Sequence, residues 1–217
     1  MPKPMFVWSG SAWVSVAAEV ESLATYATQS YADNQPGMKL VVPTSVTVGS
    51  GSGSVSTQGA VTFSGASSVS LNGCFTSAYD NYKIVFTKAY SSTAGAVRTR
   101  LRASGTDNTT ASSYVRRGFG SDVPSGLYNQ TEATTSWYCF NATTSSTSYS
   151  FQTMEIYNPF LATETQMTST QLERNGDTGS MQIAYHNQTT SYDGITFFST
   201  SSYNLTGTIR VYGLKNG

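Results

Sequence analysis

Residues 97–103 read Val-Arg-Thr-Arg-Leu-Arg-Ala, in which every second side chain is an arginine. Successive side chains of a β-strand point to opposite faces, so Arg98, Arg100 and Arg102 share one face of this segment. The smaller or apolar side chains between them share the other face, which can pack on a core. This period of two residues predicts a half-buried β-strand.

The same pattern continues over residues 61–217. Short runs rich in β-branched and aromatic residues alternate with clusters of Gly, Asn, Asp and Ser, which are turn residues. Many short strands separated by turns favour a mainly β chain folded as an antiparallel β-sandwich, similar to a jelly roll. The expected strands cover residues 61–64, 67–71, 82–90, 97–103, 114–118, 134–141, 148–157, 166–174, 180–186, 194–199 and 208–212.

The three arginines of residues 97–103 need anions nearby, because like charges on one strand face repel each other. Two interpretations of Arg98, Arg100 and Arg102 stay open. In the first, they pair with carboxylates of a neighbouring strand or subunit, for which Glu155 and Glu173 are candidates. In the second, they form a surface contact for acidic glycans or for a negatively charged particle surface.

An aromatic segment lies near the start of the chain. Residues 6–14 read FVWSGSAWV, which predicts two short strands around a Ser-Gly-Ser turn. Two strands alone are not stable in water, so their aromatic side chains must pack on the rest of the chain or on another protein. Phe6, Trp8 and Trp13 are therefore candidate anchor residues.

The period changes after this segment. Over residues 16–34, apolar or small side chains recur at alternating spacings of four and three residues, which predicts a short helix with one oligomerising seam. Isolated helices of this length are marginal, so the seam needs partners, and parallel helices around a symmetry axis would supply them. The alternative is a helix docked on its own domain. The expected oligomerisation residues are Val16, Val20, Leu23 and Ala27.

Residues 36–60 join the two regions. An extended apolar stretch over residues 39–48 is followed by GSGSGS at residues 49–54, and Gly/Ser tracts usually act as flexible linkers or long surface loops. The sequence thus predicts an N-terminal anchor and short helix over residues 1–35, an extended segment and linker over residues 36–60, and a β-sandwich head over residues 61–217.

Composition argues against several classes of protein. The 217 residues include 12 Lys or Arg and 12 Asp or Glu, so the net charge is zero, and 11% of residues are charged. Without a basic excess the chain is not expected to bind nucleic acid. We expect no membrane insertion and no signal peptide, because no apolar run has the required length. Ser and Thr supply roughly 64 residues, which suits strands with uncharged polar outer faces.

Residues that could carry catalysis are sparse. His186 is the single histidine, no GxSxG segment marks a serine nucleophile, and we expect His186 to make a hydrogen bond at a strand end. Cys74 and Cys139 lie in strand-like segments without a CxxC pair, which favours two buried free thiols. We expect no metal, no cofactor and no enzyme activity. A hydrolase with paired carboxylates is the alternative, since sequence does not give their separation in space.

Three segments of the β region resemble a known family. Residues 75–82 (FTSAYDNY) lead into a strand, residues 156–160 read IYNPF, and residues 205–213 read LTGTIRVYG. They look like the β-rich domain of tailed-bacteriophage virion proteins, which are described as minor tail proteins or tail fibres, or as head fibres or capsid decoration proteins. The opening VWSGSAWV at residues 7–14 is similar to the attachment segment of such fibres. The resemblance covers most of residues 60–217 and this short start, and its motifs are structural.

The resemblance implies a non-enzymatic structural protein of the virion, assembled in the host cytoplasm. We expect a homotrimeric tail fibre or tail adhesion protein that attaches to another virion protein through its N-terminus. Its sandwich would point outward, where it would either contact host surface glycan or simply decorate the particle. A capsid decoration protein or head fibre is the alternative, and a glycan-degrading enzyme is a third.

Overall fold

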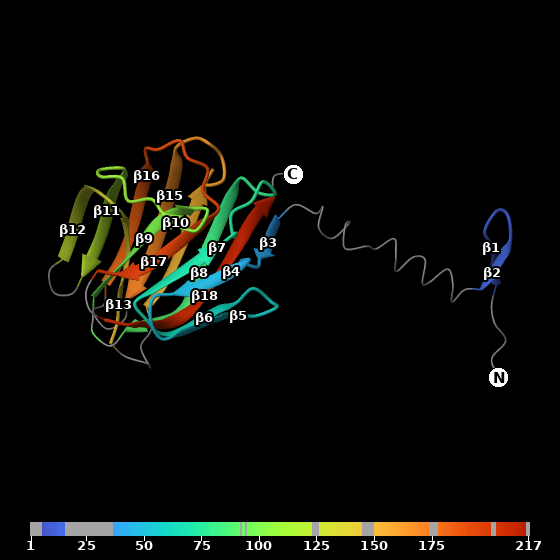
Figure 1. Ribbon diagram of the computed structural model, residues 1–217, viewed down its shortest axis with the longest axis horizontal. Coiled ribbons are helices and arrows are strands. Elements are labelled where there is room, and N and C mark those ends of the chain that lie inside the picture. Colours follow the sequence, from blue (N-terminus) through green and yellow to red (C-terminus); the bar gives the residue numbers. More distant parts are fainter. Residues whose placement is uncertain are drawn as a thin grey trace. The chain divides into compact units, whose positions relative to one another are not determined.

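The computed structural model describes residues 6–15, 37–91, 93, 95–122, 126–144, 150–173, 178–200 and 203–215, and the regular elements among them are β-strands. The chain divides into two compact units, one of residues 1–37 and 217 and the other of residues 38–216. The first unit contains a hairpin of β1 (Phe6–Trp8) and β2 (Trp13–Ser15). The second unit is a β-sandwich, whose two sheets are stacked in Figure 1.

The larger sheet of the sandwich has ten strands. They follow the order β12-β11-β16-β15-β14-β8-β18-β6-β5, and β3 also pairs with β18. The last strand in chain order, β18, therefore lies in the interior of the sheet, between β8 and β6. The ten strands are β3 (Gly37–Val41), β5 (Ser52–Val55), β6 (Val61–Ala66), β8 (Asn81–Ser91), β11 (Tyr114–Asp122), β12 (Gly126–Thr134), β14 (Ser150–Tyr157), β15 (Thr165–Glu173), β16 (Thr178–His186) and β18 (Leu205–Lys215).

The smaller sheet has six strands. They follow the order β10-β9-β17-β7-β4. Strand β13 pairs with the N-terminal part of β9, and β10 pairs with its C-terminal end. Its pairs are antiparallel, as are those of the larger sheet for which the register is defined, such as β11 with β16. The six strands are β4 (Ser45–Val48), β7 (Ser68–Asn72), β9 (Gly95–Ala103), β10 (Thr106–Asp107), β13 (Trp137–Ala142) and β17 (Gly194–Ser199).

The core lies between the two sheets. Phe86 of β8 makes edge-to-face contacts with Phe140 of β13 and Phe197 of β17, at centroid distances of 5.0 and 4.8 Å. Tyr114 of β11 packs in the same way on Trp137 of β13 at 5.2 Å. Because these rings come from opposite sheets and are buried, they tie the sheets together. The predicted antiparallel β-sandwich is confirmed.

The segment expected as a linker belongs to the sandwich instead. Residues 38–60 fall in the second unit, and within the Gly/Ser tract β5 pairs with β6. Glycine allows the backbone at position 53 to lie close to Val48, because a Cβ on Gly53 would lie 2.6 Å from Val48 Cγ1. Ser50 Oγ accepts from Ser67 N at 2.9 Å and donates to Gly65 O at 2.9 Å, which holds the tract against the next turn. Composition alone does not separate such a strand from a flexible tract.

The helix expected over residues 16–34 lies outside the described residues. The same holds for its candidate oligomerisation residues, which are Val16, Val20, Leu23 and Ala27. Within the described ranges no helix is long and apolar enough to cross a membrane.

Candidate functional site

The N-terminal hairpin presents its tryptophans to solvent. Trp8 and Trp13 are register partners, and their rings meet at a centroid distance of 5.6 Å and an angle of 60°. Ser9 closes the turn, since its backbone N donates to Ala12 O at 2.9 Å. The predicted pair of short strands is confirmed. Phe6, Trp8 and Trp13 are 52%, 56% and 68% exposed, so all three candidate anchor residues are accessible.

The arginine face of β9 is covered rather than open. The predicted alternation is confirmed, because Val97, Thr99 and Leu101 on the other face are fully buried. Arg98 donates to Glu132 Oε2 at 2.7 Å, with its side chain 16% exposed. The interpretation as a paired, structural row therefore describes it better than a surface contact.

The carboxylate partners of this row differ from the expected ones. They are Glu132 of β12 and Asp107 of β10, not Glu155, and the side chain of Glu173 lies outside the described ones. Glu155 instead pairs with Lys83 at 3.4 Å on the larger sheet. Arg100 donates to the backbone O of Thr135 at 3.0 Å and stacks on Phe198 with its Cζ 4.5 Å from the ring centroid. The candidate Glu155 was wrong because it lies on β14 of the larger sheet, opposite Lys83 of β8, and this placement cannot be read from the sequence.

Glu132 joins two arginines. Its Oε2 accepts from Arg98 Nη2 at 2.7 Å and from Arg116 Nε at 3.0 Å. The Arg116 side chain is 4% exposed and stacks over the ring of Tyr138, with its Cζ 4.8 Å from the centroid. The hydrogen bond from Arg116, assisted by the one from Arg98, lowers the pKa of Glu132 to about 2 although burial acts in the opposite direction. This bridge connects β12 of the larger sheet with β9 of the smaller sheet.

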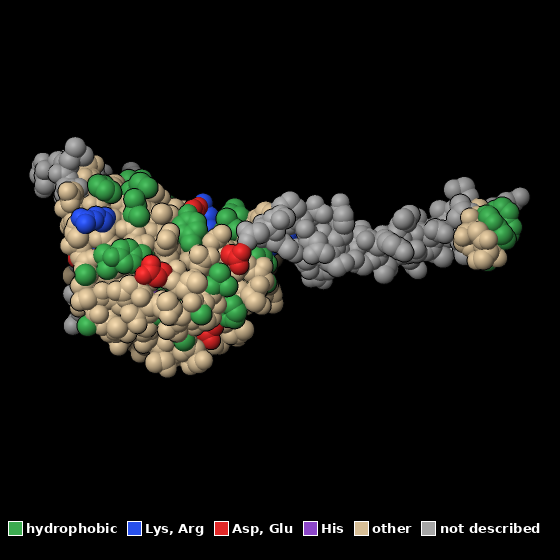
Figure 2. Space-filling model, turned by 90° about the horizontal axis from the view of Figure 1, so that it is seen from above, with side chains coloured by type: hydrophobic (Ala, Val, Ile, Leu, Met, Phe, Trp, Pro, Cys, Tyr) green, Lys and Arg blue, Asp and Glu red, His purple; other side chains and the backbone are tan. Residues whose placement is uncertain are grey.

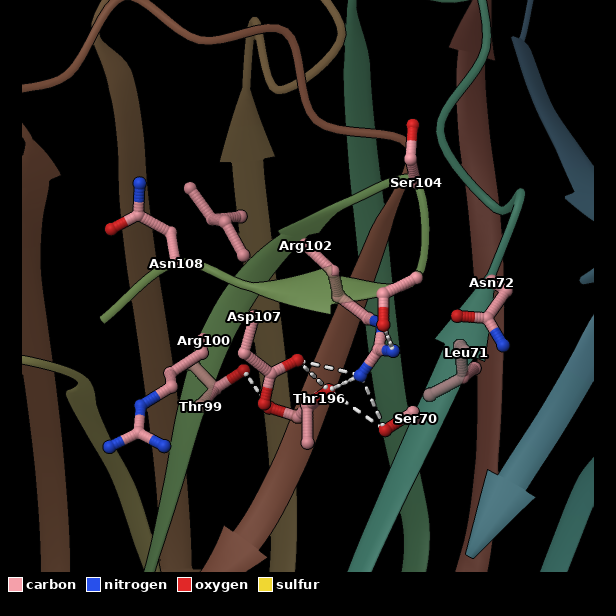
Figure 3. Close-up of polar contacts among 12 residues, drawn as sticks. Ser70, Leu71, Asn72, Thr99, Arg100, Arg102, Ser104, Asp107, Asn108 and Thr196 are labelled. Atoms are coloured by element: carbon pink, nitrogen blue, oxygen red, sulfur yellow. Dashed lines mark hydrogen bonds and ion pairs between the residues drawn. The ribbon is translucent and has the colours of Figure 1, made fainter. Parts of the chain in front are cut away.

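Arg102 is the centre of a second polar cluster, on the outer side of the smaller sheet. Its Nη1 donates to Asp107 Oδ1 at 2.6 Å, to Ser70 Oγ at 2.7 Å and to Thr196 Oγ1 at 2.6 Å. Figure 3 shows the guanidinium converging with these three side chains, while Arg100 points away from them. The β9–β10 turn covers the cluster, since Arg102 also donates to Gly105 O. Arg102 and Asp107 form an internal ion pair, and the hydrogen bonds around it hold strands β7, β9, β10 and β17 together.

His186 is buried at the end of β16. Its Nε2 lies 2.6 Å from Tyr192 Oη, so the expected hydrogen bond is confirmed, although His186 lies in the core rather than at an exposed edge. Burial lowers the pKa of His186 to about 4, which keeps the ring neutral at physiological pH. A buried neutral ring that is bonded to Tyr192 and stacked on Tyr114 at 4.2 Å acts as a structural residue.

The two thiols are free and buried, as predicted. Cys74 and Cys139 are fully buried, and burial raises the pKa of each. Thiols in this state are inert towards alkylation and oxidation. Among the described residues, no three His, Cys, Asp or Glu side chains gather closely enough to hold a metal ion.

The outer face of the larger sheet carries an apolar strip. Seven large hydrophobic side chains from residue 61 onward are exposed in the described part of the sandwich, and six of them lie on four adjacent strands. Phe119 is the cross-strand partner of Met181, and Phe151 is the partner of Leu172, so the strip extends across neighbouring strands of the sheet. We call these six residues the outer strip: Phe119, Phe151, Leu172, Met181, Ile183 and Tyr185.

A hollow of about 510 Å³ adjoins the outer strip over β11, β16 and β15. Tyr157, Tyr185 and Ile183 contribute apolar walls, and Arg117 and Glu164 contribute opposite charges. The volume and the mixture of apolar and polar groups fit a contact site better than an ordinary turn surface.

Sequence reasoning did not find the outer strip, although the signal is present in β16. Met181, Ile183 and Tyr185 alternate with Gln182, Ala184 and His186. A simple hydropathy rule places the first set inside, yet they are about half exposed while Gln182 and His186 are buried. The two-residue alternation of β16 can be read from the sequence. Which of the two sets turns inward is decided by the contacts of Gln182 and His186, which the sequence does not show.

Comparisons with known proteins identify no family for this chain. No protein-family model matches it, and no curated protein matches it. Among solved structures, the chain is similar to a peanut lectin determined with a nine-residue peptide (PVIWSSATG). The two share 9% sequence identity over 84% of this chain and 100% of the lectin chain, with a TM-score of 0.35.

Proposed function

We propose that this protein is a non-enzymatic structural protein of a tailed-bacteriophage virion, a tail fibre or tail adhesion protein attached through residues 1–35. The resemblance of residues 75–82, 156–160 and 205–213 to virion proteins supports this assignment. The observation that carries it is the exposed, edge-on pair of Trp8 and Trp13 on a hairpin with a closed turn.

The tryptophan pair suits attachment for a physical reason. Each aromatic side chain offers about 150–250 Å² of surface for burial. The hairpin already fixes the two rings against each other, so little conformational entropy is lost when a partner covers them. In this proposal another virion protein covers the rings, while residues 16–34 form the helix that joins three copies through Val16, Val20, Leu23 and Ala27.

The non-enzymatic part of the proposal is supported by three acid–base groups among the described residues that are engaged in internal contacts. Glu132 is held by Arg98 and Arg116, and Asp107 is held by Arg102. His186 is buried against Tyr192. General acid–base catalysis needs such a group within reach of a substrate proton, which these ion pairs and this burial oppose.

The sandwich contacts host surface glycan in this proposal, with surface chemistry as the support. Figure 2 shows a face on which charged side chains are few and hydrophobic ones are spread among uncharged polar groups. Exposed hydroxyls such as Ser45 and Thr47 can hydrogen-bond sugars. A glycan array probed with the full chain tests this part. Absence of binding contradicts the glycan contact and leaves the attachment role intact.

Attachment is tested on phage particles. The double variant Trp8→Ala/Trp13→Ala should be incorporated at least about tenfold less than the parent, because the anchor loses its buried rings. Leu161→Ala, which shortens an exposed side chain in the sandwich, is the matched control and should be incorporated normally. Normal incorporation of the double variant refutes the anchor.

The position on the particle is tested by imaging a gold label at the N-terminus. Label on the tail supports the tail assignment, and label on the capsid shell reassigns the protein as a head fibre or decoration protein. Measurable product in a glycan-depolymerisation assay overturns the non-enzymatic assignment.

A further inference from the structure

Three neighbouring strands of the larger sheet each carry an exposed apolar side chain next to a buried glutamine. In β14, Phe151 is exposed and Gln152 is buried, and in β15, Leu172 is exposed and Gln171 is buried. In β16, Met181 is exposed and Gln182 is buried. Burying glutamine while exposing an aromatic or aliphatic side chain opposes the hydrophobic effect in a free sandwich. The pattern becomes favourable when the outer face is covered as well.

Hydrogen bonds inside the sandwich fix this orientation. Gln152 Nε2 and Gln182 Nε2 both donate to the backbone O of Cys139 on β13, at 3.0 and 3.1 Å. Successive side chains alternate between faces, so holding these two glutamines inside turns Phe151 and Met181 outward. The outer strip is therefore a fixed feature of the fold and does not depend on side-chain rotation.

The outer strip has the area of the apolar centre of an interface between protein chains. Its six side chains are 43–56% exposed. At about 150–200 Å² for a side chain of this size, they present on the order of 500 Å² of apolar surface. A stable interface buries about 800 Å² per partner, with an apolar centre and a polar rim. Threonines and Gln166 on the same strand faces supply a rim of this kind.

The charges next to the outer strip complement each other between copies. Arg117 and Glu164 line the same hollow, and in the described part of the chain neither forms an ion pair. Arg117 donates to Thr131 Oγ1 at 2.9 Å and keeps its charge uncompensated. Each copy thus offers one cation and one anion, so a second copy can satisfy both, and the zero net charge of the chain adds no long-range repulsion.

We propose that the outer strip is an interface between copies of this chain, with Arg117 of one copy facing Glu164 of the next. This contact goes beyond attachment through residues 1–35 and does not require the helix expected over residues 16–34. It places the copies side by side through their sandwiches.

Thiol protection in the full chain tests the interface directly. Thr170 is exposed beside the outer strip as the register partner of Met181, and Thr47 is exposed on β4 of the other sheet. Since Cys74 and Cys139 are buried, a thiol introduced by Thr170→Cys or Thr47→Cys dominates alkylation by a maleimide. The Thr170→Cys thiol should react at least about tenfold more slowly than the Thr47→Cys thiol in concentrated protein.

A second substitution decides whether copies cause the protection. Met181→Glu places a charge in the outer strip and should make the Thr170→Cys thiol react as fast as the Thr47→Cys thiol. Met38→Glu, at an exposed methionine on β3, is the matched control and should leave protection unchanged. Far-ultraviolet circular dichroism verifies that each variant is folded. The proposal is overturned if the Thr170→Cys thiol reacts as fast as the Thr47→Cys thiol at every concentration, or if Met181→Glu leaves its protection intact. Either result means that copies of this chain do not cover the strip.

Discussion

Replacing Glu132 with glutamine should destabilise the sandwich in a way that depends on pH. Glu132 receives hydrogen bonds from Arg98 and Arg116, and these two arginines lie mostly out of solvent. In Glu132→Gln the two guanidinium groups lose their common anion. A buried charge that loses its partner costs more than an exposed one, because water cannot solvate it.

The magnitude follows from the pKa of Glu132. It falls from 4.5 to about 2, which sets an upper limit of about 3 kcal/mol for the stabilisation by the ionised carboxylate. The side chain is 32% exposed, so solvent screens part of this interaction. Arg116 also keeps its hydrogen bond to Gln130 Oε1 at 2.9 Å. We expect Glu132→Gln to lower the free energy of unfolding by about 1–2 kcal/mol at neutral pH.

The sign of the pH dependence separates this mechanism from a packing defect. The folded-state pKa lies below the unfolded one, so the stabilisation is complete above about pH 4.5 and is lost as the pH falls towards about 2. Urea unfolding at about pH 7 and about pH 3 should therefore show the difference between parent and variant shrink to about half or less at the lower pH. Glu155→Gln, which removes the more exposed partner of Lys83, is the control and should cost less than about 1 kcal/mol. An equal difference at both pH values refutes the electrostatic explanation.

Three further predictions concern the core and its turns. Phe86→Ala removes the ring between Phe140 and Phe197 and should lower the free energy of unfolding by about 3–5 kcal/mol in urea titrations; a loss below 1 kcal/mol contradicts its place in the core. Gly53→Ala should cost about 1–2 kcal/mol because its Cβ meets Val48, whereas Gly179→Ala, with no atom within 4 Å, should be nearly neutral; equal effects in thermal melts refute the close approach. The proton resonances of His186, the single histidine, should titrate with a midpoint near 4, so the stability that its neutral ring provides is complete above pH 6.5 and is lost towards pH 4; a midpoint near 6.5 contradicts its burial.

Local pattern predicted most of the sandwich strands, because a period of two is visible within a few residues. The alternation in residues 97–103 gave β9, and residues 194–199 gave β17 with the bounds that the structure has. Strand β12 was missed because Gly126–Thr134 is rich in polar side chains and has no alternating apolar set. An edge strand of this kind is recognised by its pairing with β11, which is a long-range property.

The contacts of the candidate site could be predicted only in part. That the arginines of β9 need carboxylates follows from charge repulsion alone, but the choice of Glu132 depends on how β12 lies relative to β9. The outer strip is a second example of a contact that the sequence predicts only in part. Alternation in β16 separates two sets of side chains, and the hydrogen bond from Gln182 to Cys139 O decides which set turns outward.

The position of β18 has a consequence for biosynthesis. Strand β18 lies between β8 and β6 in the interior of the ten-stranded sheet, so these two strands cannot be joined until residues 205–215 have left the ribosome. A nascent chain lacking them presents two unpaired strand edges, which are templates for aggregation. Translation must therefore pass residue 215 before the larger sheet can close, and a chain released earlier would be a substrate for chaperones or proteases.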